Sequence, residues 1–252
     1  DEVVIPAAAR GMYSEKVVTL PDSYQVNDRK RSIADRAFAR EELGLPARGF
    51  VFCCFNNNYK ITPPTFDAWM RILRQVEGSV LWLIEDSPVA AGNLRKEAER
   101  RGVPAERLVF AQRMALPDHL ARHRNADLFL DTLPYNAHTT ASDALWAGLP
   151  VLTCAGEAFA SRVAASLLTA VGLPELVTKT PAEFEALAVE LANDPARREQ
   201  VRARLQANRL TAPLFDTPRF ARHIEAAYEE MYERHLAGSP PDHIAVAGTR
   251  HD

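Results

Sequence analysis

Short apolar segments alternate with amphipathic segments along most of the chain. Apolar runs of strand length, such as residues 50–55 and 80–84, are each followed by a stretch in which apolar side chains recur at helical spacing. Strands that alternate with helices in this way are typical of βαβ units and a parallel sheet. Because the crossovers of such units are right-handed, every strand-to-helix turn should lie on one edge of that sheet. The pattern therefore predicts an α/β fold, a Rossmann-like parallel sheet with flanking helices.

The expected elements run from an N-terminal strand at residues 12–21 to a C-terminal helix at 217–237. The strands expected in the sheet are 50–55, 80–84, 108–110, 128–130, 151–153 and 176–177. The other helices expected are 33–43, 64–76, 90–101, 117–124, 140–147, 157–171, 181–193 and 195–208. After Gly238 we expect a loose tail with no assigned role.

Composition narrows the class of protein. Of the 252 residues, 47% are hydrophobic and 25% are charged, which is ordinary for a soluble globular protein. The net charge of −3 gives no support for binding to nucleic acid or to a membrane surface. No run approaches the roughly 18–20 apolar residues of a membrane span. The odd cysteine count, with Cys53 and Cys54 adjacent and Cys154 apart, favours a reducing compartment, so we expect a cytoplasmic protein.

The segment 131–148, DTLPYNAHTTASDALWAG, combines a strand end, a polar turn and a helix N-terminus. The first N–H groups of a helix have no internal partner, and the helix dipole is positive there, so an anion can bind. Thr139 or Thr140 can cap the helix, and the other hydroxyl can reach a phosphate oxygen. Asp143 can complete a capping box with Thr140, or it can accept hydrogen bonds from a ribose. A capped helix without any ligand is an equally good interpretation of these residues alone.

The same segment, together with FNNNYKITP at 55–63 and GEAFASRVAAS at 156–166, resembles the C-terminal catalytic lobe of O-linked N-acetylglucosamine transferases. Those two-lobed enzymes, linked to tetratricopeptide repeats, transfer GlcNAc from UDP-GlcNAc to Ser or Thr hydroxyls of proteins. The resemblance extends from about residue 12 to 235. The sister branch, the SPINDLY-type O-fucosyltransferases that use a GDP-sugar, shares the Tyr-Lys element. The HTT and GEAFASRVAAS runs look more like the GlcNAc branch.

The resemblance implies the C-terminal lobe of a GT-B glycosyltransferase. Residues 1–32 would then end the preceding N-terminal lobe, and residues 33–214 would form the lobe that binds the nucleotide sugar. Residues 215–237 would be a closing helix, and 238–252 a tail. Because the chain starts at Asp1 and shows no repeat of about 34 residues, we expect the first lobe and the tetratricopeptide repeats to be missing from it.

Lys60 lies in the short segment 56–60 just after the first strand of the predicted sheet, where ligands bind in such folds. A lysine there offers a compact positive charge to a diphosphate whose charge grows as the sugar leaves, although most lysines are merely solvated. The resemblance implies that Lys60 is the catalytic contact to the phosphate and the leaving group. It places Asn57 where a longer polar residue, usually Gln, touches the phosphate.

For the base, the resemblance implies that His119 stacks on the uracil ring, that the backbone of Met114 contacts the base, and that Arg122 lies near it. An exposed first-turn histidine is the alternative interpretation of His119. Leu116 departs from the pattern, because it stands where the animal enzymes carry a lysine near the ribose.

His138 precedes the two threonines, so it fits a hydrogen bond to the diphosphate better than the role of a catalytic base. No DxD-like carboxylate pair appears in a suitable loop, so we expect metal-independent, inverting transfer without a cofactor. The expected partners are a UDP-sugar donor and a protein acceptor that approaches from the missing lobe. Two alternatives remain: a lobe of the same fold that uses GDP-fucose, and a non-catalytic nucleotide-binding or scaffolding lobe.

Overall fold

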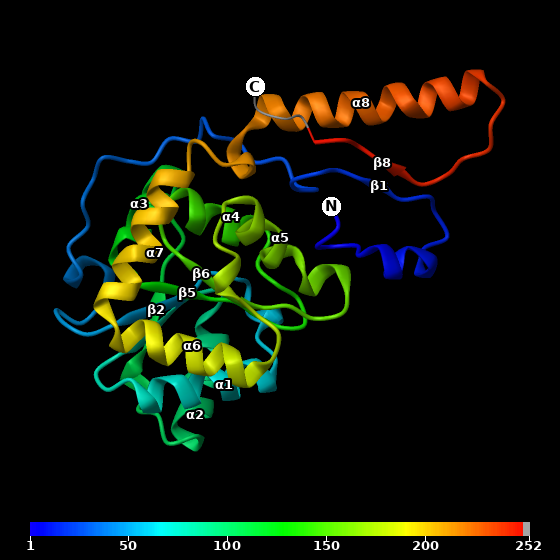
Figure 1. Cartoon of the computed structure of the whole chain (residues 1–252). Helices are drawn as coiled ribbons and strands as arrows, with labels where there is room; N and C mark the ends of the chain where they lie inside the picture. Colours follow the sequence, from blue (N-terminus) through cyan, green and yellow to red (C-terminus); the bar gives the residue numbers. More distant parts are fainter. Residues whose placement is uncertain (249–252) are drawn as a thin grey trace.

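A parallel six-stranded sheet forms the centre of the protein in the computed structural model, which describes residues 1–248 (Figure 1). The strand order is β4-β3-β2-β5-β6-β7, and every neighbouring pair is parallel. The strands are β2 (Val51–Cys54), β3 (Val80–Ile84), β4 (Leu108–Ala111), β5 (Leu128–Leu130), β6 (Val151–Cys154) and β7 (Val177–Thr178). These strands confirm the predicted α/β class, and all of them overlap the ranges expected from the sequence.

The order of strands reverses between β2 and β5. From β2 the chain builds outward through β3 and β4, and it then returns to place β5 on the other side of β2. Phe52 pairs with Leu128 and Cys53 with Phe129 across this junction. The connections after β2 and β5 leave toward opposite faces, so a crevice opens at their carboxyl ends, where α/β sheets bind ligands.

Helices cover both faces of the sheet. Figure 1 shows α1, α2 and α6 on one side and α3, α4 and α5 on the other. The helices are α1 (Pro63–Gln75), α2 (Pro88–Arg100), α3 (Leu116–Arg122), α4 (Thr139–Trp146), α5 (Val163–Ala170), α6 (Pro181–Asn193), α7 (Pro195–Asn208) and α8 (Thr217–Leu236). Side-chain caps followed by proline define several starts, such as Thr62 before α1 and the capping box of Thr180 and Glu183 at α6.

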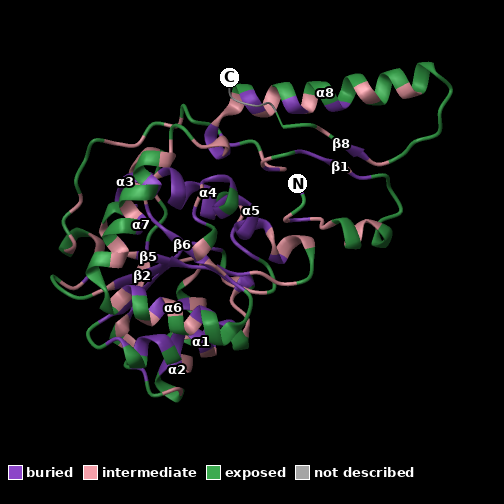
Figure 2. Ribbon diagram, viewed as in Figure 1, coloured by how far each residue is buried: buried purple, intermediate pink, exposed green. Residues whose placement is uncertain are grey.

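The core lies between the sheet and these helices. β2, β3 and β6 consist of buried residues throughout, and Figure 2 shows this burial concentrated in the sheet. Trp69 of α1 and Trp82 of β3 are both completely buried. The free thiols of Cys53, Cys54 and Cys154 belong to this core, and burial raises the pKa of each. The cysteines therefore behave as small apolar groups.

The helix predicted for residues 33–43 is wrong. Only Glu41–Leu43 forms a short 3-10 turn, and the preceding residues are irregular. No residue of this segment is buried. A helix that buries no apolar face gains little from tertiary packing, and one of this length is marginal by itself.

The helix predicted for residues 157–171 is shorter than expected. A 3-10 turn at Phe159–Ser161 precedes α5, which begins only at Val163. The backbone folds back so that the N–H of Gly156 bonds the carbonyl of Ser161 at 2.9 Å. A Cβ at residue 156 would lie 2.5 Å from the Ser161 hydroxyl, so this turn requires a glycine.

The two ends of the described chain pair with each other. β1 (Val18–Thr19) runs parallel to β8 (Ile244–Ala245), beside α8 and apart from the main sheet (Figure 1). The expectation of a loose tail is wrong for Ile244, which is 3% exposed. Short strands can pair in this way without a long apolar run to reveal them. Residues 249–252 of the predicted tail lie outside the described residues.

Candidate functional site

Lys60 lies where β2 and β5 end. It closes the 3-10 turn Asn58–Lys60, and only 9% of it is exposed. Its Nζ donates a hydrogen bond to the carbonyl oxygen of Asn136 at 2.8 Å and lies 3.8 Å from the centre of the Tyr135 ring. Burial lowers the pKa of Lys60, and the carboxylate of Asp131 opposes that shift. The ammonium is therefore held in a fixed place by the segment that follows β5.

Asn56 also links the loop after β2 to the segment after β5. The sequence analysis selected Asn57 and did not identify Asn56. Its amide Nδ2 donates to the hydroxyl of Thr132 at 2.8 Å, and its Oδ1 accepts a hydrogen bond from the hydroxyl of Thr140. Asn56 is 2% exposed. Asn57 is exposed instead, and its Oδ1 accepts a bond of 3.4 Å from Arg113. Position directly after a buried strand is the only sequence signal that distinguishes Asn56.

The N-terminus of α4 is open, and both predicted caps are wrong. His138 occupies the cap position, and no side chain of the described residues caps the helix. The Thr140 hydroxyl is turned toward Asn56, while the carboxylate of Asp143 forms an ion pair with Arg31. Thr139 is exposed as the first helical residue. The first-turn N–H groups are thus not occupied by a cap, which leaves them as donors for an anion.

His138 sits between this helix end and Lys60. Its Nε2 is 3.4 Å from the carbonyl oxygen of Ala160, and its ring meets that of Tyr135 edge-on, with centroids 4.9 Å apart. Burial lowers the pKa of His138, and the charge of Lys60 acts in the same direction. A neutral imidazole has one N–H donor. Because the carbonyl of Ala160 can only accept, that N–H lies on Nε2 and Nδ1 is an acceptor, so a hydrogen bond from His138 to a diphosphate would have to replace the contact with Ala160.

His119 and Arg122 form a second cluster, packed on Phe55 just beyond the end of β2. The Phe55 ring lies 5.3 Å from the ring of His119 and 4.6 Å from the guanidinium carbon of Arg122. Arg122 is completely buried and donates to Nδ1 of His119 at 2.6 Å and to the carbonyl of Gln112 at 2.6 Å. Arg122 therefore lies behind His119 and not on the open surface.

This contact defines the tautomer of His119. A guanidinium has no acceptor, so Nδ1 must accept the bond and the neutral ring must carry its proton on Nε2. Burial is the main cause that lowers the pKa of His119, to about 3, and the nearby His123 and Arg122 add to it. His119 thus presents a neutral, half-buried ring.

Met114 and Leu116 border this cluster. Met114 is partly buried in the loop between β4 and α3, and Leu116 begins α3 with 47% of its surface exposed. The nearby cation on this loop is Arg113, which pairs with Asp86 at 2.6 Å. All the predicted site residues therefore lie in loops or helices that follow the carboxyl ends of β2, β4 and β5.

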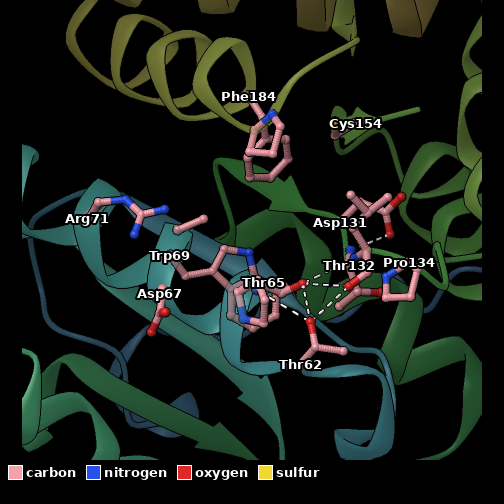
Figure 3. A pocket seen from close by; sticks show the side chains of 14 residues that line it. Thr62, Thr65, Asp67, Trp69, Arg71, Asp131, Thr132, Pro134, Cys154 and Phe184 are labelled. Carbon is pink, nitrogen blue, oxygen red and sulfur yellow. Dashed lines mark hydrogen bonds between the residues drawn. The ribbon is translucent and has the colours of Figure 1, made fainter. Parts of the chain in front are cut away.

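A cavity of about 400 Å³ borders the segment after β5 on the side of α1 and α6. Figure 3 shows Asp131, Thr132 and Pro134 on one side of it and Asp67 and Arg71 on the other. The hydroxyls of Thr62 and Thr65, which line the cavity, both donate to the carbonyl of Leu133. Their role here is to hold that segment against α1. In residues 1–248, no three His, Cys, Asp or Glu side chains gather as metal ligands would.

Comparison with known proteins shows the family of the chain. Residues 34–224 match the model of glycosyl transferase family 41. The chain is 38% identical over 252 residues to a probable UDP-N-acetylglucosamine–peptide N-acetylglucosaminyltransferase, SEC of Arabidopsis thaliana, with 98% of this chain and 26% of that protein covered. It is 40% identical over 206 residues to the Caenorhabditis elegans UDP-N-acetylglucosamine–peptide N-acetylglucosaminyltransferase, with coverage of 82% and 18%.

Among solved structures, the chain resembles an O-GlcNAc transferase mutant of Thermobaculum terrenum, with a TM-score of 0.79 and 32% identity over 92% of this chain and 44% of that one. The fold, a parallel six-stranded sheet with flanking helices, is that of a GT-B glycosyltransferase lobe. The chain belongs to glycosyl transferase family 41, the O-GlcNAc transferase and SPINDLY family. It spans about a quarter or less of the length of these curated relatives. No helix within residues 1–248 has the length and apolar character needed to cross a membrane.

We expect His119 to remain neutral, with its proton on Nε2, from pH 5 to 8, because its pKa is lowered to about 3. Ring nitrogen–proton correlation NMR across a pH series measures both properties. Arg122→Met should release the tautomer and raise the pKa, whereas Arg124→Met, at an exposed neighbouring position, should leave both unchanged. A His119 that titrates near pH 6.5 in the unmodified protein would contradict the assignment.

Proposed function

We propose that this chain supplies the donor-binding part of a protein O-GlcNAc transferase, which moves GlcNAc from UDP-GlcNAc to Ser or Thr hydroxyls with inversion. The observation that carries the proposal is that two groups able to attract an anion contact the same segment of the chain. The buried ammonium of Lys60 and the uncapped N-terminus of α4 are both attached to the segment 131–140. The names of the Arabidopsis and C. elegans relatives state UDP-N-acetylglucosamine as the donor and a peptide as the acceptor for those proteins.

In the proposed reaction, the acceptor oxygen forms a bond to the anomeric carbon of GlcNAc while the bond from that carbon to the diphosphate breaks. The electron pair of the broken bond stays on the diphosphate, and the acceptor hydroxyl gives up its proton, which is released to water. Lys60 and the first-turn N–H groups of α4 would stabilise that charge as it develops. Donors that are already oriented are the strongest means of doing so, because they need no rearrangement during the reaction. Lys60 meets this condition through Asn136 and Tyr135.

The nucleotide would bind along the same edge. The uracil ring would stack on His119 and contact the backbone of Met114, with Arg122 fixing His119 from behind. Asp143, which already pairs with Arg31, keeps acceptor capacity for a ribose hydroxyl. The thiols of the core suit a cytoplasmic setting, where they stay reduced. The acceptor protein would approach from another lobe of the complete enzyme, which would also carry the tetratricopeptide repeats.

A scaffolding lobe that binds nucleotide without transfer is the second candidate, and two observations favour it. Leu116 places an exposed apolar side chain where the family resemblance expects a lysine. Asn57 is turned toward Arg113 and is exposed, so it is not aligned with Lys60. Both features would lower the affinity for the nucleotide. Neither changes the hydrogen bond from Lys60 to Asn136 or the contact of Lys60 with Tyr135.

Lys60→Met should lower the rate of GlcNAc transfer by the complete enzyme by about 10²–10³-fold, because it removes a preoriented cation from the leaving group. Radiolabel transfer to a protein acceptor measures the rate, and circular dichroism checks the fold. Lys96→Met, on the exposed side of α2, serves as the control. Near-normal turnover by the Lys60 variant would remove this residue from the mechanism.

Calorimetric titration of the complete enzyme with UDP, GDP and their sugars distinguishes the candidate functions. Preference for UDP is the expected result. A preference for GDP would favour the O-fucosyltransferase alternative, since the two branches differ in the base they accept. UDP binding without any transfer of sugar would identify a scaffolding lobe.

Transfer should continue in excess EDTA, because the proposed leaving-group stabilisation comes from Lys60 and α4. The assay compares initial rates before and after chelation, and again after addition of excess Mg²⁺. Activity that disappears with EDTA and returns with Mg²⁺ would show that a divalent ion shares the diphosphate.

A further inference from the structure

Asp131 directly follows β5, and only 4% of it is exposed. Its Oδ1 accepts the backbone N–H of Thr132 at 2.7 Å and that of Ala137 at 2.6 Å. Its Oδ2 accepts the hydroxyl of Thr153, on the neighbouring strand β6, at 2.6 Å. One side chain therefore joins both ends of the loop 132–137 to each other and to the sheet. Figure 3 shows Asp131 beside Thr132 at the first end of this loop.

The loop that Asp131 closes carries the proposed phosphate contacts. The carbonyl of Asn136 accepts the bond from Lys60, and the amide of Asn136 donates back to the carbonyl of Thr132 at 2.8 Å. Ala137 is followed at once by His138, the cap residue of α4. If the ends of the loop separated, the ammonium of Lys60 would lose its carbonyl partner and α4 would lose its fixed start.

We infer that Asp131 is a positioning residue of the donor site, whose carboxylate clasps the loop 132–137 so that Lys60 and the first turn of α4 face the same phosphate group. The inference rests on the proposed function, because it assigns Asp131 a role only through those two contacts. Asp131 itself does not touch the substrate.

The charges around Asp131 agree with a functional role. The ionisable groups that act on it are Lys60, Cys54 of β2 and Cys154 of β6, and burial keeps both thiols neutral.

Burial also raises the pKa of Asp131 to about 7, against the opposing bonds from Thr153, Ala137 and Thr132. A carboxyl whose pKa rises on folding binds protons more strongly in the folded state. Its contribution to stability therefore falls as pH rises from about 4 towards 7. A charge that costs stability at neutral pH is typical of functional sites.

The test compares Asp131→Ala with Asp127→Ala in the complete enzyme. Asp127 lies at the opposite end of the same strand, where it accepts the N–H of Val51 at 2.9 Å, far from the carboxyl edge. Calorimetry with UDP should show an affinity loss of at least about tenfold for Asp131→Ala and less than about twofold for Asp127→Ala. Asp131→Asn, whose amide oxygen can accept both loop N–H groups, should restore most of the lost affinity.

Hydrogen exchange of the Thr132 and Ala137 amides, measured without UDP, provides a readout that does not need ligand. Both amides should lose protection in Asp131→Ala and keep it in Asp127→Ala. If Asp131→Ala fails to fold, Thr153→Val still removes one of the three bonds, and we expect an affinity loss of about threefold to fivefold.

Two outcomes separate the inference from the proposed function. If the unmodified enzyme binds UDP and the Asp131→Ala variant binds it equally well, the inference is overturned and the proposed function stands. The same holds if Thr153→Val is tested in place of an unfolded variant and its affinity is unchanged. If the unmodified enzyme does not bind UDP, the proposed function fails and the inference fails with it.

Discussion

The hydrogen bond from Lys60 to the carbonyl of Asn136 is the interaction on which the rest of the site depends. A lysine that is nearly buried loses solvation, and the structure offsets that loss with a carbonyl, an aromatic face and a nearby carboxylate. These partners all belong to the segment that leaves β5. The reversal of strand order brings this segment next to the end of β2, so the topology of the sheet is what allows one lysine and one helix N-terminus to meet.

The histidine rings near that meeting point are neutral. His119, His123 and His138 all have lowered pKa values, with burial as the largest cause, so they add no charge near neutral pH. Arg122 is covered by Phe55 and His119. A diphosphate that entered this edge would meet the cation of Lys60 and the dipole of α4, with neutral histidine rings around them and Arg113 paired to Asp86 on the rim. Because the strongest attraction is local, it acts on the phosphates and not on the base.

The sequence predicted the parts of the structure that depend on local pattern. Apolar runs revealed the strands, and helical spacing revealed α1, α6 and α8. Prediction from the sequence failed where contacts between residues far apart in the chain determine the local structure. Thr140 has the chemistry of a cap, but its hydroxyl bonds Asn56, 84 positions away. β8 exists only because β1 pairs with it. Residues 33–43 have helix-forming side chains, but only Ile33 and Leu43 pack against the core, and neither is fully buried. Asn56 and Asn57 are chemically identical, so only the fold distinguishes the buried link from the exposed neighbour.

The family resemblance expects a lysine where this chain has Leu116. The effect of this difference follows from the place of residue 116 in the fold. A lysine there would lie on α3, which follows β4, whereas the proposed phosphate contacts follow β2 and β5. Its loss therefore removes charge from the nucleotide side of the edge and leaves Lys60 and α4 intact. Arg113, three positions earlier, still brings a guanidinium to Asn57 and Asp86 on the same rim. The substitution should affect how tightly the nucleotide is held more than how well the leaving group is stabilised, because the proposed function assigns those two tasks to loops that follow different strands.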